Sequence, residues 1–316
     1  MQKITAFFRL VRYRNLIIVI ITQYFIRFAL TSQFLKIPAL SSLQFLLFVF
    51  TTVLITAAGY IINDIYDVET DSINKKGKLI IGKIIKAKTA IIWYSVFNLI
   101  ALALGVYLAI IIREPFYSLV FVYCIFFLWR YSKAMKKAFL IGNIHVAILT
   151  SLVLINTALF DIIPAIHYSG NVSILAKTCV KIVLVYALFS FLLTLVRELI
   201  KDIEDEQGDK IIKANTMAIV LGTRNAKKIV FSLIIIVVIG VAFVQYFQLE
   251  DFNWEQETFP ILYTALIQIF LLFFLRKLYL AKEKSDFYCD FESKTWIIDF
   301  FCTIFYLLIT RKFKTT

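Results

Sequence analysis

Long apolar segments separated by short charged ones repeat along the whole chain. A helix needs about 20 mostly apolar residues to cross roughly 30 Å of hydrocarbon, and nine segments approach that length between polar or charged flanks. The pattern predicts an all-α membrane protein with about nine transmembrane helices and no soluble domain, so that residues 1–316 form one multi-pass membrane domain. The predicted spans cover residues 15–34, 43–63, 89–112, 115–130, 138–160, 178–197, 229–247, 258–275 and 295–310.

The composition agrees with this fold class. Residues of the AVILMFWYC set make up 61% of the chain and charged residues only 17%, whereas about 25% charged residues is typical of a soluble domain. The mean hydropathy of +0.83 excludes a disordered or collagen-like chain. The four cysteines form no CxxC pair and there are only two histidines, so the sequence indicates neither a disulfide framework, a zinc site nor a haem site.

The charge of the chain is strongly positive, with 34 Lys and Arg against 21 Asp and Glu. In a soluble protein this excess would favour a nucleic-acid partner, but the cytoplasmic loops of membrane proteins are themselves enriched in Lys and Arg. A cytoplasmic N-terminus puts most basic residues on the inner side, which predicts a multi-pass cell-membrane protein without a nucleic-acid partner. No obligate protein partner is indicated. The basic residues that fall elsewhere are Arg27, Lys36, Arg113, Lys177, Lys181, Arg311, Lys312 and Lys314.

Two acidic segments follow the second and the sixth predicted spans, both on the inner side, at residues 63–71 and 197–209. In each segment three aspartates are spaced i, i+3 and i+7, which predicts that their carboxylates share one face of a helix. Like charges at this spacing destabilise a helix, so packing alone gives no reason for them. The two trios are Asp64, Asp67 and Asp71, and Asp202, Asp205 and Asp209.

A divalent cation gives such a reason, because Mg²⁺ prefers oxygen ligands and completes its shell with water and substrate phosphate. A single acidic run at a helix end is more commonly a solvated surface, whereas two runs on one side of the membrane indicate a metal site. Basic side chains flank both runs, which favours a metal-bridged polyanion, most simply a diphosphate. Positive-inside topology explains most of these lysines equally well. We predict that Lys78, Lys136 and Arg197 contact the diphosphate.

These segments resemble the UbiA superfamily of intramembrane prenyltransferases. The first acidic segment matches the family's NDxxDxxxD signature in full from Asn63 to Asp71, and residues 202–209 resemble its second aspartate-rich motif. The stretch from Tyr131 to Asn143 is similar to the family's YS…K…GN segment, with Lys136 at the lysine position. Three further stretches depart from the family pattern. Tyr13 replaces the proline of an R-P-x-N motif, residues 74–79 lack the usual prolines, and Thr216-Met217-Ala218 stands where T-L-P is usual.

The resemblance implies a helix bundle around a central cavity that opens to the cytoplasmic side. It also implies an enzyme, in contact with membrane lipid, that transfers a prenyl group from a prenyl diphosphate to a lipophilic acceptor. Mg²⁺ is the implied cofactor, neutralising the leaving diphosphate, and Tyr131 is expected to line the position of the allylic cation. The implied catalytic residues are Asp64, Asp67, Asp202, Asp205 and Tyr131; the diphosphate ligands are Asn63, Lys78, Lys136 and Arg197; the Mg²⁺ ligands are Asn63, Asp64, Asp67, Asp71, Asp202, Asp205 and Asp209.

The acceptor is the open part of this interpretation. Residues 197–209 are more similar to the branch of the family that includes digeranylgeranylglyceryl phosphate synthase and chlorophyll synthase, and they lack the D-R-x-D-D run of the 4-hydroxybenzoate branch. We therefore expect geranylgeranyl transfer to a glycerol-phosphate hydroxyl in ether-lipid synthesis. One alternative is aromatic prenylation in quinone synthesis. Another is a cation transporter, which predicts acids near the bilayer midplane and broken helices; a purely structural membrane protein would have no use for the aspartates.

Overall fold

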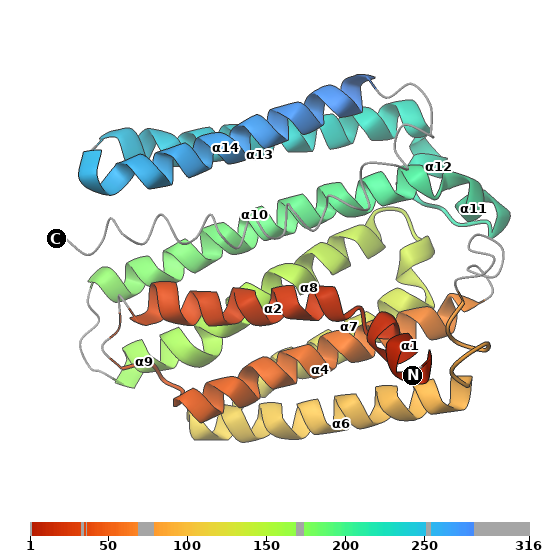
Figure 1. The fold of residues 1–316 in the computed structure, drawn as a ribbon, viewed down its shortest axis with the longest axis horizontal. Helices are drawn as coiled ribbons and strands as arrows, with labels where there is room; N and C mark the ends of the chain where they lie inside the picture. Colours follow the sequence, from red (N-terminus) through yellow and green to blue (C-terminus); the bar gives the residue numbers. More distant parts are fainter. Residues whose placement is uncertain are drawn as a thin grey trace.

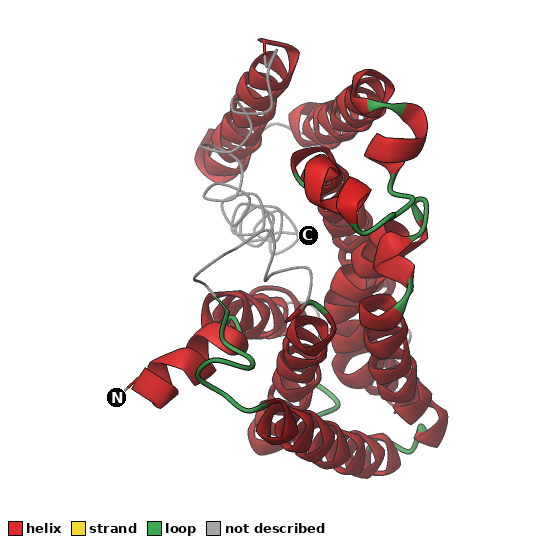
Figure 2. Cartoon of the chain, turned by 90° about the vertical axis from the view of Figure 1, so that its right-hand side faces the viewer, coloured by secondary structure: helices red, strands yellow, loops and turns green. Residues whose placement is uncertain are grey.

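The computed structural model describes residues 2–32, 35, 37–68, 79–168, 174–250 and 254–280. In this part the chain forms helices and loops, apart from one isolated bridge between Ile81 and Ile85 (Figure 2). In chain order the elements are α1 (Gln2–Leu10), α2 (Tyr13–Phe25), the π-helix η1 (Ile26–Thr31), α4 (Ser42–Tyr66), α6 (Ala87–Ile111), η2 (Pro115–Ser118), α7 (Leu119–Lys133), η3 (Met135–Lys137), α8 (Ile141–Thr157), the π-helix η4 (Ala158–Ile162), α9 (Ile163–Tyr168), α10 (Ile174–Glu204), α11 (Glu206–Ile211), α12 (Met217–Leu221), α13 (Thr223–Glu250) and α14 (Trp254–Leu280).

Seven of the described helical segments are long and apolar enough to cross a membrane. They coincide with the first seven predicted spans. The eighth predicted span, residues 258–275, lies within α14, and the ninth, residues 295–310, lies outside the described residues. The chain is therefore an all-α, multi-pass membrane protein, and the total of nine spans stays a prediction.

The spans run side by side along the length of the molecule (Figure 1). α4 packs against α6 and α7, α8 packs against α10, and α10 in turn contacts α13, which pairs with α14. α4 is the most buried of the seven spans. Its start is fixed by a capping box in which Ser41 and Gln44 exchange hydrogen bonds between side chain and backbone. A core of large buried side chains, including Phe45, Phe48 and Phe121, locks α4 to its neighbours by close packing.

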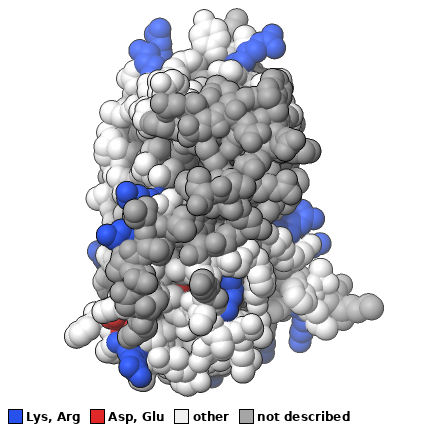
Figure 3. Space-filling model, turned by 90° about the vertical axis from the view of Figure 1, so that its left-hand side faces the viewer, with Lys and Arg blue, Asp and Glu red and all other residues white. Residues whose placement is uncertain are grey.

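Both acidic segments emerge at the same end of the bundle, where α1, α11, α12 and the last turn of α4 gather (Figure 1). We call this the charged end and the opposite one the far end. The face of the far end drawn in Figure 3 carries a few Lys and Arg side chains, and hardly any acidic atoms are visible among its described residues.

A buried ion pair holds the far end together. The Nη1 atom of Arg27 lies 3.2 Å from Oδ1 of Asp161, and the two side chains are 9% and 0% exposed. Arg27 also donates to the Leu40 carbonyl over 2.7 Å, and the Leu40 N–H donates to Asp161 over 3.0 Å. The guanidinium lies 4.4 Å from the centre of the Phe45 ring. Both charged residues sit in π-helical turns, η1 and η4. Arg27 departs from the positive-inside pattern because it is paired within the bundle.

The Arg27→Met substitution should lower the stability of the purified protein in detergent by roughly 3–5 kcal/mol, because it leaves the Asp161 carboxylate buried without its partner. The double substitution Arg27→Met with Asp161→Leu should regain most of that loss, since it removes both charges. Thermal and denaturant unfolding measure the difference. Equal losses in the single and double variants would contradict this account of the pair.

Candidate active site

The first acidic segment makes polar contacts at the end of α4 that lies at the charged end of the bundle. Asn63 and Asp64 occupy the last turn of the helix, and Asp67 follows directly after it. The Asn63 side-chain amide donates to Oδ2 of Asp67 over 2.8 Å, and the Lys136 ammonium forms an ion pair with Oδ1 of the same carboxylate. Nη2 of Arg12 lies 3.4 Å from Oδ1 of Asp64. Each of the two aspartates is thus paired with a cation from another part of the chain.

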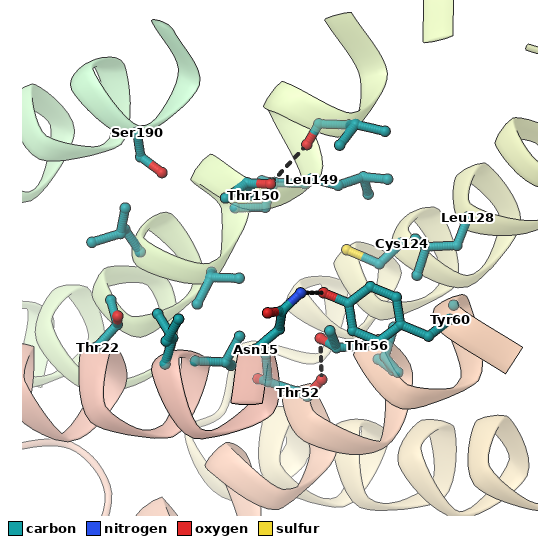
Figure 4. A pocket seen from close by; sticks show the side chains of 18 of the residues that line it. Asn15, Thr22, Thr52, Thr56, Tyr60, Cys124, Leu128, Leu149, Thr150 and Ser190 are labelled. Carbon is teal, nitrogen blue, oxygen red and sulfur yellow. Dashed lines mark hydrogen bonds between the residues drawn. The ribbon is translucent and has the colours of Figure 1, made fainter. Parts of the chain in front are cut away.

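Arg12 reaches this position through an unusual backbone conformation. It joins α1 to α2 with φ 51° and ψ 55°, the left-handed region that non-glycine residues seldom occupy. Its guanidinium lies 4.7 Å from the centre of the Tyr60 ring. The Tyr60 hydroxyl in turn accepts a hydrogen bond of 3.0 Å from Asn15 (Figure 4). Left-handed residues of this kind are commonly held at functional sites by their surroundings.

A close backbone approach positions Lys136. The lysine lies in the short 3-10 turn η3, and Gly142 at the start of α8 packs directly against that turn. A Cβ atom on Gly142 would lie 2.6 Å from the Met135 carbonyl oxygen and 3.0 Å from the Lys136 Cα. Only glycine permits this contact. The next residue, Asn143, donates to Oδ2 of Asp202 over 2.9 Å. The Gly142-Asn143 pair therefore holds Lys136 on one side and the second acidic segment on the other.

The second acidic segment is not the one continuous helix that its spacing predicts, although Asp209 stays within electrostatic range of both Asp202 and Asp205. α10 continues past the predicted end at residue 197 to Glu204, Asp205 breaks the helix at φ −83° and ψ 0°, and α11 then carries Asp209. Five acids in residues 202–209 would repel one another along a single helix. The break lets them take different partners: Glu206 binds Lys210 over 2.6 Å and the Thr223 hydroxyl over 2.8 Å.

The two acidic segments meet around Lys136 and Tyr131. Lys136, paired with Asp67, also lies within electrostatic range of Asp209. Tyr131 lies within the same range of both Asp67 and Asp202. Backbone contacts join the loops as well, since the N–H of Asn215 donates to the Lys137 carbonyl over 2.8 Å. The fold thus brings Asn63, Asp64, Asp67, Tyr131, Lys136, Asp202 and Asp209 together at the charged end.

Negative charge at this end is incompletely compensated. Burial, and next to it the carboxylate of Asp205, raises the pKa of Asp209 to about 6. In the described part of the chain no group of three Asp, Glu, His or Cys side chains is arranged to hold a metal ion. The donor set nevertheless fits Mg²⁺, which is usually held by one or two carboxylates with substrate phosphates and water as the remaining ligands. Asp71 and Lys78, both predicted to take part, lie outside the described residues.

A cavity of about 250 Å³ begins at the charged end and runs into the bundle between α2, α4, α7, α8 and α10. Its mouth is polar and its middle is apolar, with Leu128, Leu149 and the Cys124 thiol group along the wall (Figure 4). The residues that line the mouth are Arg12, Asn15, Tyr60, Asn63, Tyr131, Arg197, Glu198 and Lys201. The predicted Asn63, Tyr131 and Arg197 are therefore wall residues of the cavity.

The sequence interpretation missed Glu198 and Lys201 as parts of this wall. Nη2 of Arg197 lies 3.0 Å from Oε1 of Glu198, whose side chain is 6% exposed. Lys201 lies within electrostatic range of the same carboxylate. Both residues lie just beyond the predicted end of the sixth span at residue 197, so the hydropathy pattern carried no signal that they line a cavity inside the bundle.

The fold and the site define a multi-pass membrane protein with an internal cavity suited to an amphipathic substrate that has an anionic head and an apolar tail. The sequence matches the UbiA prenyltransferase family over residues 25–296. The chain belongs to this family, and it is therefore a prenyltransferase.

Relatives and solved structures refine the comparison. The chain is 32% identical to digeranylgeranylglyceryl phosphate synthase of Methanosphaera stadtmanae, covering 73% of this chain and 74% of the relative. It is 28% identical to the Sulfurisphaera tokodaii enzyme of that name, covering 78% and 80%. A solved structure from work on digeranylgeranylglyceryl phosphate synthase in membranes superposes with a TM-score of 0.66 at 23% identity, covering 99% of this chain and 100% of that one. An Archaeoglobus fulgidus UbiA homolog bound to DMAPP and Mg²⁺ gives 0.61 at 18% identity, covering 97% and 99%. At these identities the two structures establish the fold.

The Lys136→Met substitution should weaken binding of a prenyl diphosphate by about tenfold or more, because a hydrogen bond to a charged group is lost. Binding of the acceptor should change less. The matched control is Lys133→Met, whose ammonium is outside the site and lies 4.9 Å from the centre of the Trp129 ring. Titration calorimetry with each substrate measures the two affinities. A larger loss for the acceptor than for the diphosphate would assign Lys136 to the acceptor instead.

The Gly142→Ala substitution should displace the turn that carries Lys136 and destabilise the protein by roughly 1–3 kcal/mol, the usual cost of overpacking. The affinity for prenyl diphosphate should fall with it. Ile141→Ala, at the exposed neighbouring position, serves as the control. Thermal unfolding and diphosphate titration test this, and wild-type affinity in Gly142→Ala would show that the turn does not depend on the glycine contact.

Proposed function

We propose that this enzyme transfers a geranylgeranyl group from its diphosphate to the hydroxyl of a prenylated glycerol phosphate, forming an ether lipid. The observation that carries the proposal is the likeness to relatives named digeranylgeranylglyceryl phosphate synthase over about three quarters of both chains. The charged side chains at the mouth of the cavity also support the proposal. Three cations, Arg12, Arg197 and Lys201, line its mouth beside one carboxylate, Glu198, which suits two substrates that both carry phosphate.

In the proposed reaction the bond between C1 of the prenyl group and the diphosphate oxygen breaks, and the electron pair leaves with the diphosphate. A bond forms between C1 and the glycerol hydroxyl oxygen, which releases its proton. The candidate ligands for Mg²⁺ are Asn63, Asp64, Asp67, Asp71, Asp202, Asp205 and Asp209, of which one or two carboxylates would hold the ion together with diphosphate oxygens and water. When bound, Mg²⁺ supplies positive charge that neutralises the leaving group.

The side chains of the cavity have separate tasks in this proposal. Lys136, Arg197 and Lys78 bind phosphate oxygens and orient the head of the donor. Tyr131 faces C1 as positive charge develops there, and its ring stabilises that charge. The apolar wall behind it excludes water, which would otherwise capture the prenyl group.

We also propose that residues 1–316 act as one membrane domain with the charged end and the N-terminus toward the cytoplasm. The support is the gathering of basic residues around the loops of that end, among them Lys133, Lys136, Lys137 and Lys210. With this orientation both water-soluble phosphate heads enter the cavity from the side on which soluble metabolites are made. The acids lie at helix ends, not at the bilayer midplane, so this site lacks the geometry expected of a cation transporter.

A product assay tests the acceptor. Purified enzyme with Mg²⁺ and geranylgeranyl diphosphate is offered geranylgeranylglyceryl phosphate, 4-hydroxybenzoate or a naphthoate, and the products are identified by mass spectrometry. We expect the ether product, its loss on chelation of Mg²⁺, and a drop of at least about 100-fold in Asp205→Asn, since that change removes a charge that stabilises the transition state. Glu114→Gln, near the far end, is the control acid. Prenylation of an aromatic acceptor alone would overturn the glycerol assignment, and full turnover without Mg²⁺ would overturn the metal site.

A further inference from the structure

The part of the cavity farthest from the charged end carries polar side chains among apolar ones such as Phe121 and Leu154, although it lies in an apolar bundle. On α2 the wall runs from Asn15 to Thr22, which corresponds to roughly 10 Å of helix. Besides Thr22, the polar lining residues of this part are Thr52 of α4, Asn156 of α8 and Tyr186 of α10. A prenyl chain with its head at the charged end would therefore point its last methyl groups at polar side chains.

Asn156 is the unusual member of this group. It is 3% exposed and lines the cavity, and its side-chain carbonyl oxygen has no hydrogen-bond partner among the described residues. The hydroxyls along the same wall are satisfied within their own helices: Thr56 donates to the Thr52 carbonyl over 2.8 Å and Thr150 to the Val146 carbonyl over 2.9 Å (Figure 4). A buried carbonyl without a partner is costly. The Asn156 oxygen therefore calls for a donor from inside the cavity.

Gln23 repeats this feature on the neighbouring helix. It is fully buried, its amide nitrogen donates to the Thr52 hydroxyl over 3.1 Å, and its carbonyl oxygen lacks a partner in the described part of the chain. Gln23 lies about one turn before Arg27 along α2, and Asn156 lies about one turn before Asp161 along α8. The Arg27–Asp161 ion pair therefore lies about one helical turn beyond the polar side chains of Gln23 and Asn156. These side chains cannot move farther from the charged end, and so lengthen the cavity, without breaking the buried ion pair.

We propose that Asn156, together with the Gln23–Thr52 pair, forms a polar floor that sets the greatest length of prenyl chain the enzyme accepts. The inference rests on the proposed function and concerns the donor, whatever the acceptor is. A chain that stops short of the floor leaves room for a water molecule that donates to the Asn156 carbonyl, in a space that is polar enough to hold one. A longer chain displaces that water and offers only C–H groups, so the carbonyl is left unpaired and the longer donor is rejected.

The test compares Asn156→Leu with the wild-type enzyme. Leucine keeps the branched shape of asparagine and removes the acceptor. kcat/KM is measured for geranyl, farnesyl, geranylgeranyl and geranylfarnesyl diphosphate with one acceptor. We expect wild type to discriminate sharply at one step of this series, and Asn156→Leu to reduce that discrimination by about tenfold, the usual effect of one unpaired buried polar group. Thr157→Val is the control, because this buried hydroxyl donates to the Val153 carbonyl of its own helix over 3.1 Å and is not among the residues that line the cavity; it should keep the wild-type profile.

Binding of the same four donors is measured in parallel from the rise in melting temperature that each produces. This readout needs no acceptor, so absence of transfer with every acceptor counts against the proposed function alone. A wild-type chain-length profile of binding in Asn156→Leu would overturn the polar floor. If Asn156→Leu cannot be purified in folded form, Asn156→Ala tests the same prediction, since it also removes the carbonyl and should also admit the longer donor.

Discussion

The charged end depends on one electrostatic constraint: many carboxylates are gathered at the end of an apolar bundle, and few cations are near enough to compensate them. Lys136 carries much of this task, since it is paired with Asp67 and lies within range of Asp209. Its placement explains local features that look unrelated. Leu140 adopts φ 58° before α8, which ends the lysine-bearing loop abruptly, and Gly142 then admits the η3 turn against the helix.

Hydropathy predicted the spans well because burial in lipid imposes a minimum length of apolar sequence. Hydropathy failed to predict where the sixth span ends, because charged residues there obscure the apolar positions. Leu199, Ile200 and Ile203 are each at most 2% exposed and pack in the core shared by α10, α12 and α13. The helix therefore continues through the acidic segment with one face in the core. The helical spacing of these three apolar residues was visible in the sequence. The charged residues around them, however, lowered the mean hydropathy of the segment, so the predicted span ended before it.

The residue types of the site could be predicted from the sequence, whereas their pairing could not. Arg12 and Asp64 are 52 residues apart, and Lys136 and Asp67 are 69 apart, so only the packing of α2, α4 and α8 decides that they meet. The spacing argument assumes an unbroken helix, which holds for Asp64 of α4 but not across the second trio. Asp205 ends α10, and the repulsion used to infer a metal is equally a reason for the chain to bend.

Two of the Arg/Lys–Asp pairs among the described residues, Arg27–Asp161 and Lys136–Asp67, have similar chemistry, and their environments give them opposite properties. At the far end Asp161 is fully buried and Arg27 nearly so, so separating them would leave a charge in a medium that cannot solvate it. At the charged end Lys136 and Asp67 are 15% and 20% exposed, and an ion pair that water reaches contributes little to stability. In the proposed function, a diphosphate with several negative charges would therefore take Lys136 from Asp67 at small cost. The partly exposed pair would then be exchanged for substrate, while the buried pair keeps the opposite end of the bundle fixed.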